Sequence, residues 1–494
     1  MVFEVWAPRA RRVELEVSGR RQLLEQRPDG WYGLAAEAAA GSDYAYILDG
    51  GEPLPDPRSN WQPEGVHGPS RLVDHGAFQW TDGSWRGVSL PAAVLYELHV
   101  GTFTPEGTFQ AVIGKLDHLL ALGVTAIELM PVAEFPGVRN WGYDGVGLYA
   151  AHHAYGGPEG LKRLVDACHA RGLGVLLDVV YNHLGPEGNY LGRFGPYLTG
   201  RHQTPWGDAV DFGVRAVRDY VIGNALMWLR DYHIDGLRLD AVHAIVDESP
   251  KHILQELAES RPRGRLLVAE SNRVEPLLTG RYGLDAQWND DFHHALHVLL
   301  TGERQGYYAP FGQVGQLARE LAAPPPERYV VFAQNHDQVG NRATGDRLGP
   351  DQLRLAAAPL LLGPCPALLF MGQEWGASSP FLFFSDHGDP GTAKGTTQGR
   401  IAEFAAFGWK PEDVPDPQNP ASFERSRLDW SELEREPHRS LLEWHQRLIA
   451  ARRRLGRAPA RVQSDEERRT LELTRDDVSV SCDFGAGTVE VKGL

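Results

Sequence analysis

Short apolar runs alternate with amphipathic stretches over most of the chain. Eight runs have the pattern of buried strands, in the order AVLYELHVGTF, VTAIELMPVA, LGVLLDVVYNH, IDGLRLDAVH, GRLLVAES, LDAQWND, RYVVFAQNHDQ and CPALLFMGQEW. Residues 107–123 and 158–172, which lie between some of these runs, have the apolar spacing of helices. Near-continuous apolar strands separated by helices indicate a parallel sheet covered by helices. Eight such units over roughly 360 residues fit a closed (β/α)8 TIM barrel better than an open sheet, so the predicted fold class is α/β.

The two ends of the chain have a different pattern, in which apolar and polar residues alternate over short stretches. Residues 1–90 include FEVWAPRARRVELEV and further short strands broken by Gly and Asp, which predicts an N-terminal β-sandwich. Residues 91–456 form the predicted barrel, with long loops at 134–157 and 184–213 and a last helix at 441–456. Residues 457–494, which include VSVSCDF and TVEVKGL, predict a short C-terminal β segment.

Composition excludes several classes of function. Hydrophobic residues make up 42% and charged residues 23% of the chain, which is ordinary for a soluble enzyme. The 49 Lys and Arg against 65 Asp and Glu give a net charge of −16, which disfavours nucleic acid and anionic membranes as partners. The three cysteines have no ligand-like spacing, and neither a signal-peptide pattern nor a long apolar run occurs. We therefore expect a cytoplasmic protein without membrane or nucleic-acid partners.

Polar residues end the predicted strands, always at their carboxyl ends. The third run ends in Asp178, Asn182 and His183, and the fourth in Arg238, Asp240 and His243. Glu270 ends the fifth run, and the seventh ends in Asn335, His336 and Asp337. In a TIM barrel these ends meet on the face that carries the active site. Because four strands agree, we expect a catalytic centre there.

The charges in GLRLDAVH, residues 236–243, suggest its chemistry. Arg238 and Asp240 are two positions apart in a strand, so their side chains face the same side. We expect Arg238 to hold Asp240 ionised, whereas burial and the nearby charges of Asp240 and Asp337 should raise the pKa of the more distant Glu270. Two carboxyls in such different environments separate a nucleophile from a general acid. This is the pattern of glycoside hydrolysis.

Four motifs resemble the signature regions of the α-amylase superfamily of glycoside hydrolases. They are DVVYNH (178–183), GLRLDAVH (236–243), VAES (268–271) and QNHDQVGN (334–341), in the expected order and on the expected strands. The resemblance implies that Asp240 is the nucleophile, Glu270 the general acid/base and Asp337 the transition-state stabiliser. It implies that the N-terminal sandwich is carbohydrate-binding-module-like. It also implies sugar contacts from Tyr143, Asp144, His183, Arg238, His243, His336, Gln338 and Asn341.

Within that superfamily, further segments are similar to the maltooligosyltrehalose trehalohydrolases. They include YELHVGTFTPEGTF, DAQWNDDFHHALH, MGQEWGASSPFLFFSDH and FAAFGW. This resemblance implies cleavage of the α-1,4 bond next to the terminal trehalose of maltooligosyltrehalose, release of trehalose, and a pathway link to a maltooligosyltrehalose synthase. It places on the trehalose side Asp290, Asp291, Phe292, His293, His294, Glu374 and Phe381.

Two alternatives remain open from the sequence. A glucan-branching transglycosylase of the same superfamily carries the same three acids. A catalytically inactive sugar-binding subunit is disfavoured because Asp240, Glu270 and Asp337 are all intact. No cofactor and no metal are expected, because Asn182, at a position where many amylases have a calcium ligand, lacks the further oxygen ligands that Ca²⁺ requires. The adjacent His293 and His294 would point apart.

Overall fold

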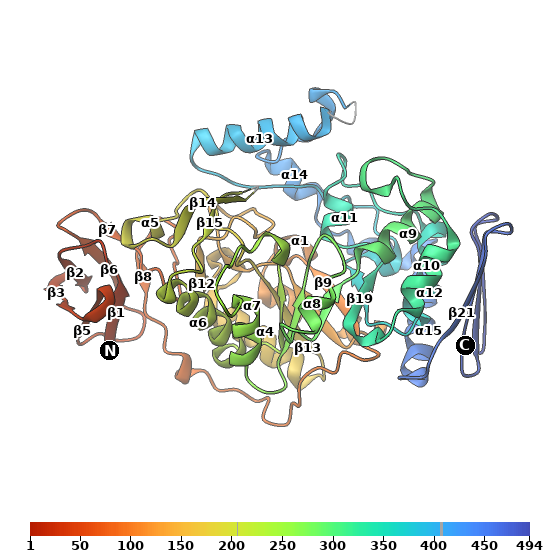
Figure 1. Ribbon diagram of the computed structural model, residues 1–494, viewed down its shortest axis with the longest axis horizontal. Coiled ribbons are helices and arrows are strands. Elements are labelled where there is room, and N and C mark those ends of the chain that lie inside the picture. The colour runs from red at the N-terminus through yellow and green to blue at the C-terminus, as the bar shows by residue number, and fades with distance from the viewer. Residues whose placement is uncertain (205, 406–408) are drawn as a thin grey trace.

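A closed ring of eight parallel strands forms the centre of the computed structural model, which describes residues 1–204, 206–405 and 409–494 (Figure 1). Each strand lies within one of the eight predicted apolar runs, so the predicted TIM barrel is confirmed. In chain order the strands are β9 (Val94–Leu98), β10 (Ala126–Leu129), β13 (Gly174–Val179), β16 (Gly236–Leu239), β17 (Leu266–Ala269), β18 (Ala286–Trp288), β19 (Tyr329–Phe332) and β20 (Ala367–Phe370).

Alternation along these strands separates two cores. Leu95, Leu176, Val268 and Leu368 belong to one buried cluster inside the ring. Residues one position along, such as Tyr96 and Leu177, belong to the core between strands and helices. Because side chains point the same way every second residue, the next inward layer contains charged residues where the apolar pattern is broken. These are Glu97, Glu128, Asp178, Arg238 and Glu270.

Helices cover the outside of the barrel (Figure 1). The predicted helix at 158–172 is confirmed as α4, and the one at 441–456 as α15. The predicted helix at 107–123 is instead two helices, because Lys115, at φ −109° and ψ 0°, interrupts it. The helices are α1 (Val100–Phe103), α2 (Phe109–Ile113), α3 (Leu116–Leu122), α4 (Gly157–Ala170), α5 (Leu191–Phe194), α6 (Arg215–Asp231), α7 (Ile253–Ser260), α8 (Pro276–Thr279), α9 (Asp290–Thr301), α10 (Val314–Ala322), α11 (His336–Gly340), α12 (Pro350–Leu362), α14 (Pro420–Arg425) and α15 (His438–Leu455).

The two long loops each contain a β-hairpin. In the first loop, β11 (Ala133–Glu134) pairs with β12 (Gly147–Ala151). In the second, β14 (Leu198–Thr204) pairs with β15 (Gly207–Val210). The segment after β20 carries α13 (Pro390–Ala405), which stands out as an arm at the top of Figure 1. Part of the FAAFGW segment, residues 406–408, lies outside the described residues.

Antiparallel sheets lie at both ends of the molecule (Figure 1). The N-terminal strands form the sheets β1-β5-β4 and β3-β2-β6-β7, with β8 paired to β6, and β21 to β24 form the C-terminal sheet. We propose domain boundaries near residues 90 and 456. These strands are β1 (Val2–Trp6), β2 (Val13–Val17), β3 (Arg20–Leu23), β4 (Glu25–Gln26), β5 (Trp31–Ala35), β6 (Asp43–Leu48), β7 (Pro53–Leu54), β8 (Ser70–Arg71), β21 (Arg461–Asp465), β22 (Thr470–Arg475), β23 (Val478–Asp483) and β24 (Thr488–Lys492).

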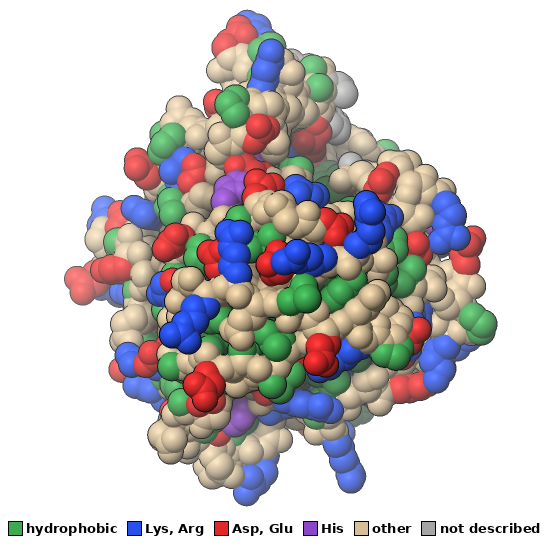
Figure 2. Space-filling model, turned by 90° about the vertical axis from the view of Figure 1, so that its left-hand side faces the viewer, with side chains coloured by type: hydrophobic (Ala, Val, Ile, Leu, Met, Phe, Trp, Pro, Cys, Tyr) green, Lys and Arg blue, Asp and Glu red, His purple; other side chains and the backbone are tan. Residues whose placement is uncertain are grey.

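The surface beside the N-terminal sheets carries both signs of charge. In Figure 2, which faces this side, blue Lys and Arg side chains are interspersed with red Asp and Glu side chains. Among the described residues, none of the helices has the length and apolar character needed to cross a bilayer.

Candidate active site

Arg238, on β16, is the centre of a charged cluster at the carboxyl ends of the barrel strands. Its side chain is fully buried, and Nη1 donates to Asp178 Oδ2 at 2.8 Å and to Asp240 Oδ1 at 2.7 Å. Nη2 lies 3.6 Å from Glu270 Oε2 and 4.0 Å from Asp337 Oδ2. The structure therefore brings together the three predicted acids around one guanidinium, which offsets part of their mutual repulsion. Glu270 is farther from it than Asp240, as expected.

Asp240 directly follows the last residue of β16 and is held through both carboxylate oxygens. While Arg238 binds Oδ1, the side-chain amide of Asn182 donates to Oδ2 at 2.7 Å and to the backbone oxygen of Asp240 at 2.9 Å. The remaining amide oxygen of Asn182 lies 2.5 Å from His183 Nδ1. Asn182 therefore orients Asp240, and its amide is already used by these contacts.

Glu270 follows β17 and has one oxygen tied to the backbone. The N–H of Ala241 donates to Glu270 Oε2 at 2.6 Å, and Ala241 adopts the left-handed conformation, with φ 40° and ψ 49°. Few non-glycine residues adopt this conformation, and here it accompanies the bond to the carboxyl group. Because Oε2 faces this donor and the guanidinium, the acidic proton belongs on Oε1.

The environment of Glu270 favours the protonated acid. Burial, followed by the negative charges of Asp240, Asp337 and Asp290, raises its pKa to about 8, although Arg238 opposes the shift. The predicted direction of the pKa is therefore confirmed. A carboxyl group with this pKa is a proton donor near neutral pH, which is what a general acid requires.

Asp337 has the opposite environment. Burial alone would raise its pKa, but the imidazolium of His336 and the charge of Arg238 outweigh that effect and lower the pKa to about 2. His336 Nε2 lies 3.3 Å from Asp337 Oδ2, and Asn341 donates to Oδ1 at 3.1 Å. Asp337 is thus an anion at every working pH, able to accept hydrogen bonds from sugar hydroxyls.

Tyr143 links this histidine to the other side of the site. Its hydroxyl lies 2.7 Å from His336 Nε2 and donates to Asp178 Oδ2 at 2.6 Å, and its ring stacks on that of His336. Burial raises the pKa of Asp178 to about 7 against the opposing charge of Arg238. Tyr143 thereby lies on the floor of the site, where the resemblance places it beneath the sugar.

The other predicted contacts differ in their hydrogen bonding and exposure. His183 Nε2 donates to the backbone oxygen of Tyr143 at 2.9 Å, and Gln338 donates to the side chain of Asp290. His243 is exposed, and its Nδ1 accepts the N–H of Asn272 at 3.3 Å. Three further residues predicted to contact the sugar are partly exposed: Asp144, Asp291 and His294.

Two aromatic residues predicted on the trehalose side are not available to a sugar. Phe292 and Phe381 have no exposed surface. Phe381 stacks on Trp141 with ring centroids 5.1 Å apart, and Phe292 packs in the core beneath α9. Because a sugar platform must present an open face, both assignments are corrected to core packing.

Glu374 and His293 are corrected for the same reason. Arg238 and His336, also predicted as sugar contacts, are fully buried too and act only on the residues beside them. Glu374 has no exposed surface and accepts hydrogen bonds from Tyr96 Oη at 3.0 Å and His118 Nε2 at 2.8 Å. His293 is 1% exposed, and its two ring nitrogens are bonded to the Ala333 carbonyl and the Tyr308 hydroxyl. Neither has a polar atom left for substrate.

Two exposed aromatic residues were missed by the sequence interpretation. Trp206, at the turn between β14 and β15, is 48% exposed and stacks on His183 at 4.5 Å with an interplanar angle of 10°. Tyr307 is 56% exposed and lies 4.9 Å from the ring of His294. The only signal in the sequence was an aromatic residue inside a polar loop, which does not show that it faces the site.

One group among the described residues has the composition of a metal site. Ligand atoms of Glu134, His152 and His153 lie within 4.8 Å of one another. However, Glu134 already accepts the Nδ1–H of His153 at 2.7 Å and its backbone N–H at 2.9 Å. His152 Nδ1 accepts the N–H of Ala154, so its hydrogen is on the nitrogen that faces Glu134. This bonding is that of a hydrogen-bonded cluster at the base of the β11–β12 loop.

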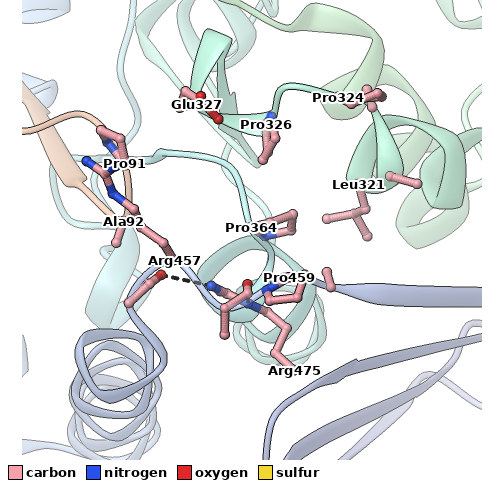
Figure 3. Close-up of a pocket in the computed structure, with 15 residues that line it drawn as sticks. Pro91, Ala92, Leu321, Pro324, Pro326, Glu327, Pro364, Arg457, Pro459 and Arg475 are labelled. Atoms are coloured by element: carbon pink, nitrogen blue, oxygen red, sulfur yellow. Dashed lines mark hydrogen bonds between the residues drawn. The ribbon is translucent and has the colours of Figure 1, made fainter.

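A cavity of about 370 Å³ lies at the opposite end of the barrel (Figure 3). Pro91, Pro326 and Pro364, which line it, precede strands β9, β19 and β20. The Arg475 guanidinium there is bonded to four backbone carbonyls. The Arg475 cation is fully engaged, and apart from Glu327 and Arg457 the lining is mainly proline and alanine, so the cavity lacks the converging polar groups of a catalytic site.

Known proteins resemble the chain over its whole length. The family model of the α-amylase catalytic domain matches residues 72–196. A malto-oligosyltrehalose trehalohydrolase of Arthrobacter ramosus is 50% identical over 99% of this chain and 94% of its own. A 1,4-α-glucan branching enzyme of Salinibacter ruber is 30% identical over 76% of this chain and 71% of its own.

A solved structure agrees with these relatives. The crystal structure of a Salmonella typhimurium protein described as a candidate α-amylase has a TM-score of 0.90 and 41% identity, covering 97% of this chain and 90% of its own. Together with the barrel and the acids around Arg238, the identity to the Arthrobacter enzyme decides the assignment. The chain belongs to the malto-oligosyltrehalose trehalohydrolase family of the α-amylase superfamily.

Proposed function

We propose that the chain is a retaining glycoside hydrolase that cleaves the α-1,4 bond next to the terminal trehalose of maltooligosyltrehalose and releases trehalose. The single observation that carries the chemistry is the grouping of Asp240, Glu270 and Asp337 around Arg238. The Arthrobacter relative, a malto-oligosyltrehalose trehalohydrolase at 50% identity, supports the substrate. The branching enzyme is a more distant relative, at 30% identity, which favours hydrolysis over branching.

In the proposed reaction each acid has its own step. Glu270 transfers the proton on Oε1 to the glycosidic oxygen, which leaves with trehalose, while an Asp240 carboxylate oxygen attacks the anomeric carbon. Glu270 is then an anion and takes a proton from water. The oxygen of that water displaces Asp240 from the anomeric carbon, and the maltooligosaccharide leaves with its α-configuration retained. Asp337 and Tyr143 hold the hydroxyls and ring of the sugar under attack, and the buried His336 acts through these two residues.

The proposed function is tested by the products formed from maltopentaosyl trehalose. We expect chromatography to show trehalose and maltopentaose in equal amounts, with the α-anomer of maltopentaose formed first. The control is the Asp240→Asn variant, which should form neither product. Branched glucan without trehalose would establish the transglycosylase instead.

The activity should fall on the alkaline side of neutrality. Glu270 must be protonated to act as the acid, and its pKa is raised by burial to about 8. The active fraction is therefore full well below this pH and is lost as the pH rises through it. A pH profile of kcat/KM, which reports the free enzyme, should show this alkaline limb. Full activity at pH 10 would contradict the assignment of Glu270.

Trp206 should contribute to substrate binding rather than to the chemical step. We expect Trp206→Ala to raise KM roughly five- to tenfold, corresponding to about 1 kcal/mol of lost stacking, with kcat within twofold. The matched control is Trp80→Ala, because Trp80 also stacks on a histidine, His233, at 3.8 Å but lies in the segment that precedes β9. An unchanged KM for Trp206→Ala would show that this indole does not contact substrate.

We further propose that the reaction takes place in the cytoplasm, on a substrate supplied by a maltooligosyltrehalose synthase. The cysteines Cys168, Cys365 and Cys482 are all buried and free, which fits a reducing compartment.

A further inference from the structure

Glu97 forms a buried ion pair with His336 behind the proposed site. Glu97 lies on β9 and points into the barrel, and His336 is the first residue of α11. Glu97 Oε1 lies 2.5 Å from His336 Nδ1, and Oε2 accepts the backbone N–H of His336 at 2.9 Å. At 1% and 0% side-chain exposure, the pair is shielded from water. A two-point contact of this kind fixes both the ring orientation and the hydrogen on Nδ1.

The other ring nitrogen of His336 faces the site. Nε2 lies 2.7 Å from the hydroxyl of Tyr143 and 3.3 Å from Asp337 Oδ2. Because the Tyr143 hydroxyl donates its hydrogen to Asp178, its oxygen is free to accept from Nε2–H. With acceptors at both nitrogens, the ring is best satisfied as an imidazolium. Burial lowers the pKa of His336, but Asp337 and Glu97 outweigh burial and hold the pKa well above its usual value.

We propose that Glu97 is a positioning residue of the hydrolysis, which keeps His336 as an imidazolium so that its Nε2–H orients Tyr143 and Asp337 toward the sugar. This inference rests on the proposed function, because it assigns Glu97 a role in that reaction. Glu97 itself touches no substrate and acts only through the histidine.

The neighbouring strand provides a contrast. Glu128 of β10 is paired in register with Glu97, is 1% exposed, and has no hydrogen-bond partner for either carboxyl oxygen among the described residues. Burial, and then the charges of Glu97 and Asp178, raise the pKa of Glu128 well above its usual value. Two adjacent glutamates in one layer of the barrel thus differ, since Glu97 pairs with a cation and Glu128 is a neutral acid.

Other groups around His336 also bear on its charge. Arg238 is a cation beyond Asp178, and His99, buried near the end of β9, is kept neutral mainly by burial, which lowers its pKa to about 4. The rings of Trp141 and Trp288 flank the imidazole. The charged or titratable groups that face it are Glu97, Asp337, Tyr143, Asp178, Arg238, Glu128 and His99.

The test compares Glu97→Gln and Glu97→Asp with wild type in kcat at pH 5.5 and pH 8. Gln still accepts a hydrogen bond but has no charge, so the pKa of His336 falls and the imidazolium loses its proton at a lower pH than in wild type. We expect Glu97→Gln to lower kcat roughly tenfold at pH 5.5 and a further tenfold at pH 8, one pKa unit being worth about a factor of ten, with KM within twofold. Glu97→Asp keeps the charge one methylene farther away, so the additional loss at pH 8 should be roughly threefold. Each variant is compared with wild type on its own, so if one of them does not fold, the other still tests the proposal.

Glu128→Gln is the matched control, because it makes the same substitution in the same layer on a neutral acid. Its kcat relative to wild type should be equal at the two pH values. Wild type and all variants lose activity at alkaline pH as Glu270 loses its proton. Dividing the kcat of each variant by that of wild type at the same pH removes this shared loss. The proposal is overturned if the Glu97 ratios do not change with pH, or if Glu128→Gln changes as Glu97→Gln does. If wild type cleaves maltooligosaccharides without releasing trehalose, the proposed function fails, and the same ratios are read from that cleavage.

Discussion

Asp240→Asn is expected to lower kcat for trehalose release by about 10⁴-fold or more. The neutral amide of Asn is a far weaker nucleophile than a carboxylate, through either its oxygen or its nitrogen, so no glycosyl-enzyme forms. The substitution also removes one charge from the group bound by Arg238 Nη1, which leaves Asp178 as the remaining strong partner of that nitrogen. Single-turnover measurements of trehalose release would show the loss.

Binding separates this result from misfolding. Titration calorimetry with maltopentaosyl trehalose should still give a measurable Kd for the Asp240→Asn variant, since most contacts to the substrate remain. Asp208→Asn, at an exposed position of β15, is a control for the substitution itself and should be fully active. A rate near wild type for Asp240→Asn would refute its role as nucleophile.

Glu270→Gln is expected to lower kcat on maltopentaosyl trehalose by roughly 10²- to 10⁴-fold, the usual contribution of acid–base catalysis. Gln has no proton to give to the leaving oxygen. Because fluoride departs without being protonated, an α-maltooligosyl fluoride should still react with Asp240 at a rate close to that of wild type, measured as the initial release of fluoride. The alkaline limb of the pH profile should also disappear in this variant.

The contrast between the two substrates is the decisive measurement for Glu270. An equal loss on the fluoride and on the natural substrate would mean that Glu270 positions the sugar or the nucleophile instead of supplying the proton. Glu275→Gln is a suitable control, since Glu275 follows the same strand and accepts a hydrogen bond from Ser271.

The strands and the clustering of the three acids were predictable because each depends on a local pattern. An apolar run such as residues 365–375 identifies a strand wherever the strand lies in space. Polar residues at the ends of parallel strands, such as Asp240 and Glu270, meet at one face by topology alone. The barrel and its three acids therefore follow from the sequence, although their distances do not.

The remaining site residues depend on which way a side chain faces over long sequence distances. Phe292 is on a helix that begins at the site, yet it points into the core. Glu97 lies in an apolar run that resembles any buried strand, and its partner His336 is 239 residues away. Trp206 lies in a polar loop whose path is set by tertiary contacts. Motif spacing contains no information on these orientations.

Closure of the ring also governs the order in which the protein can mature on the ribosome. Strand β9 pairs with β10 on one edge and with β20 on the other, and β20 is synthesised about 270 residues later. A nascent chain that stops before Phe370 therefore presents an open β edge, which favours aggregation and recruits chaperones. Enzyme assembly must wait for translation of β20, so ribosomal pausing before that point should prolong the vulnerable stage.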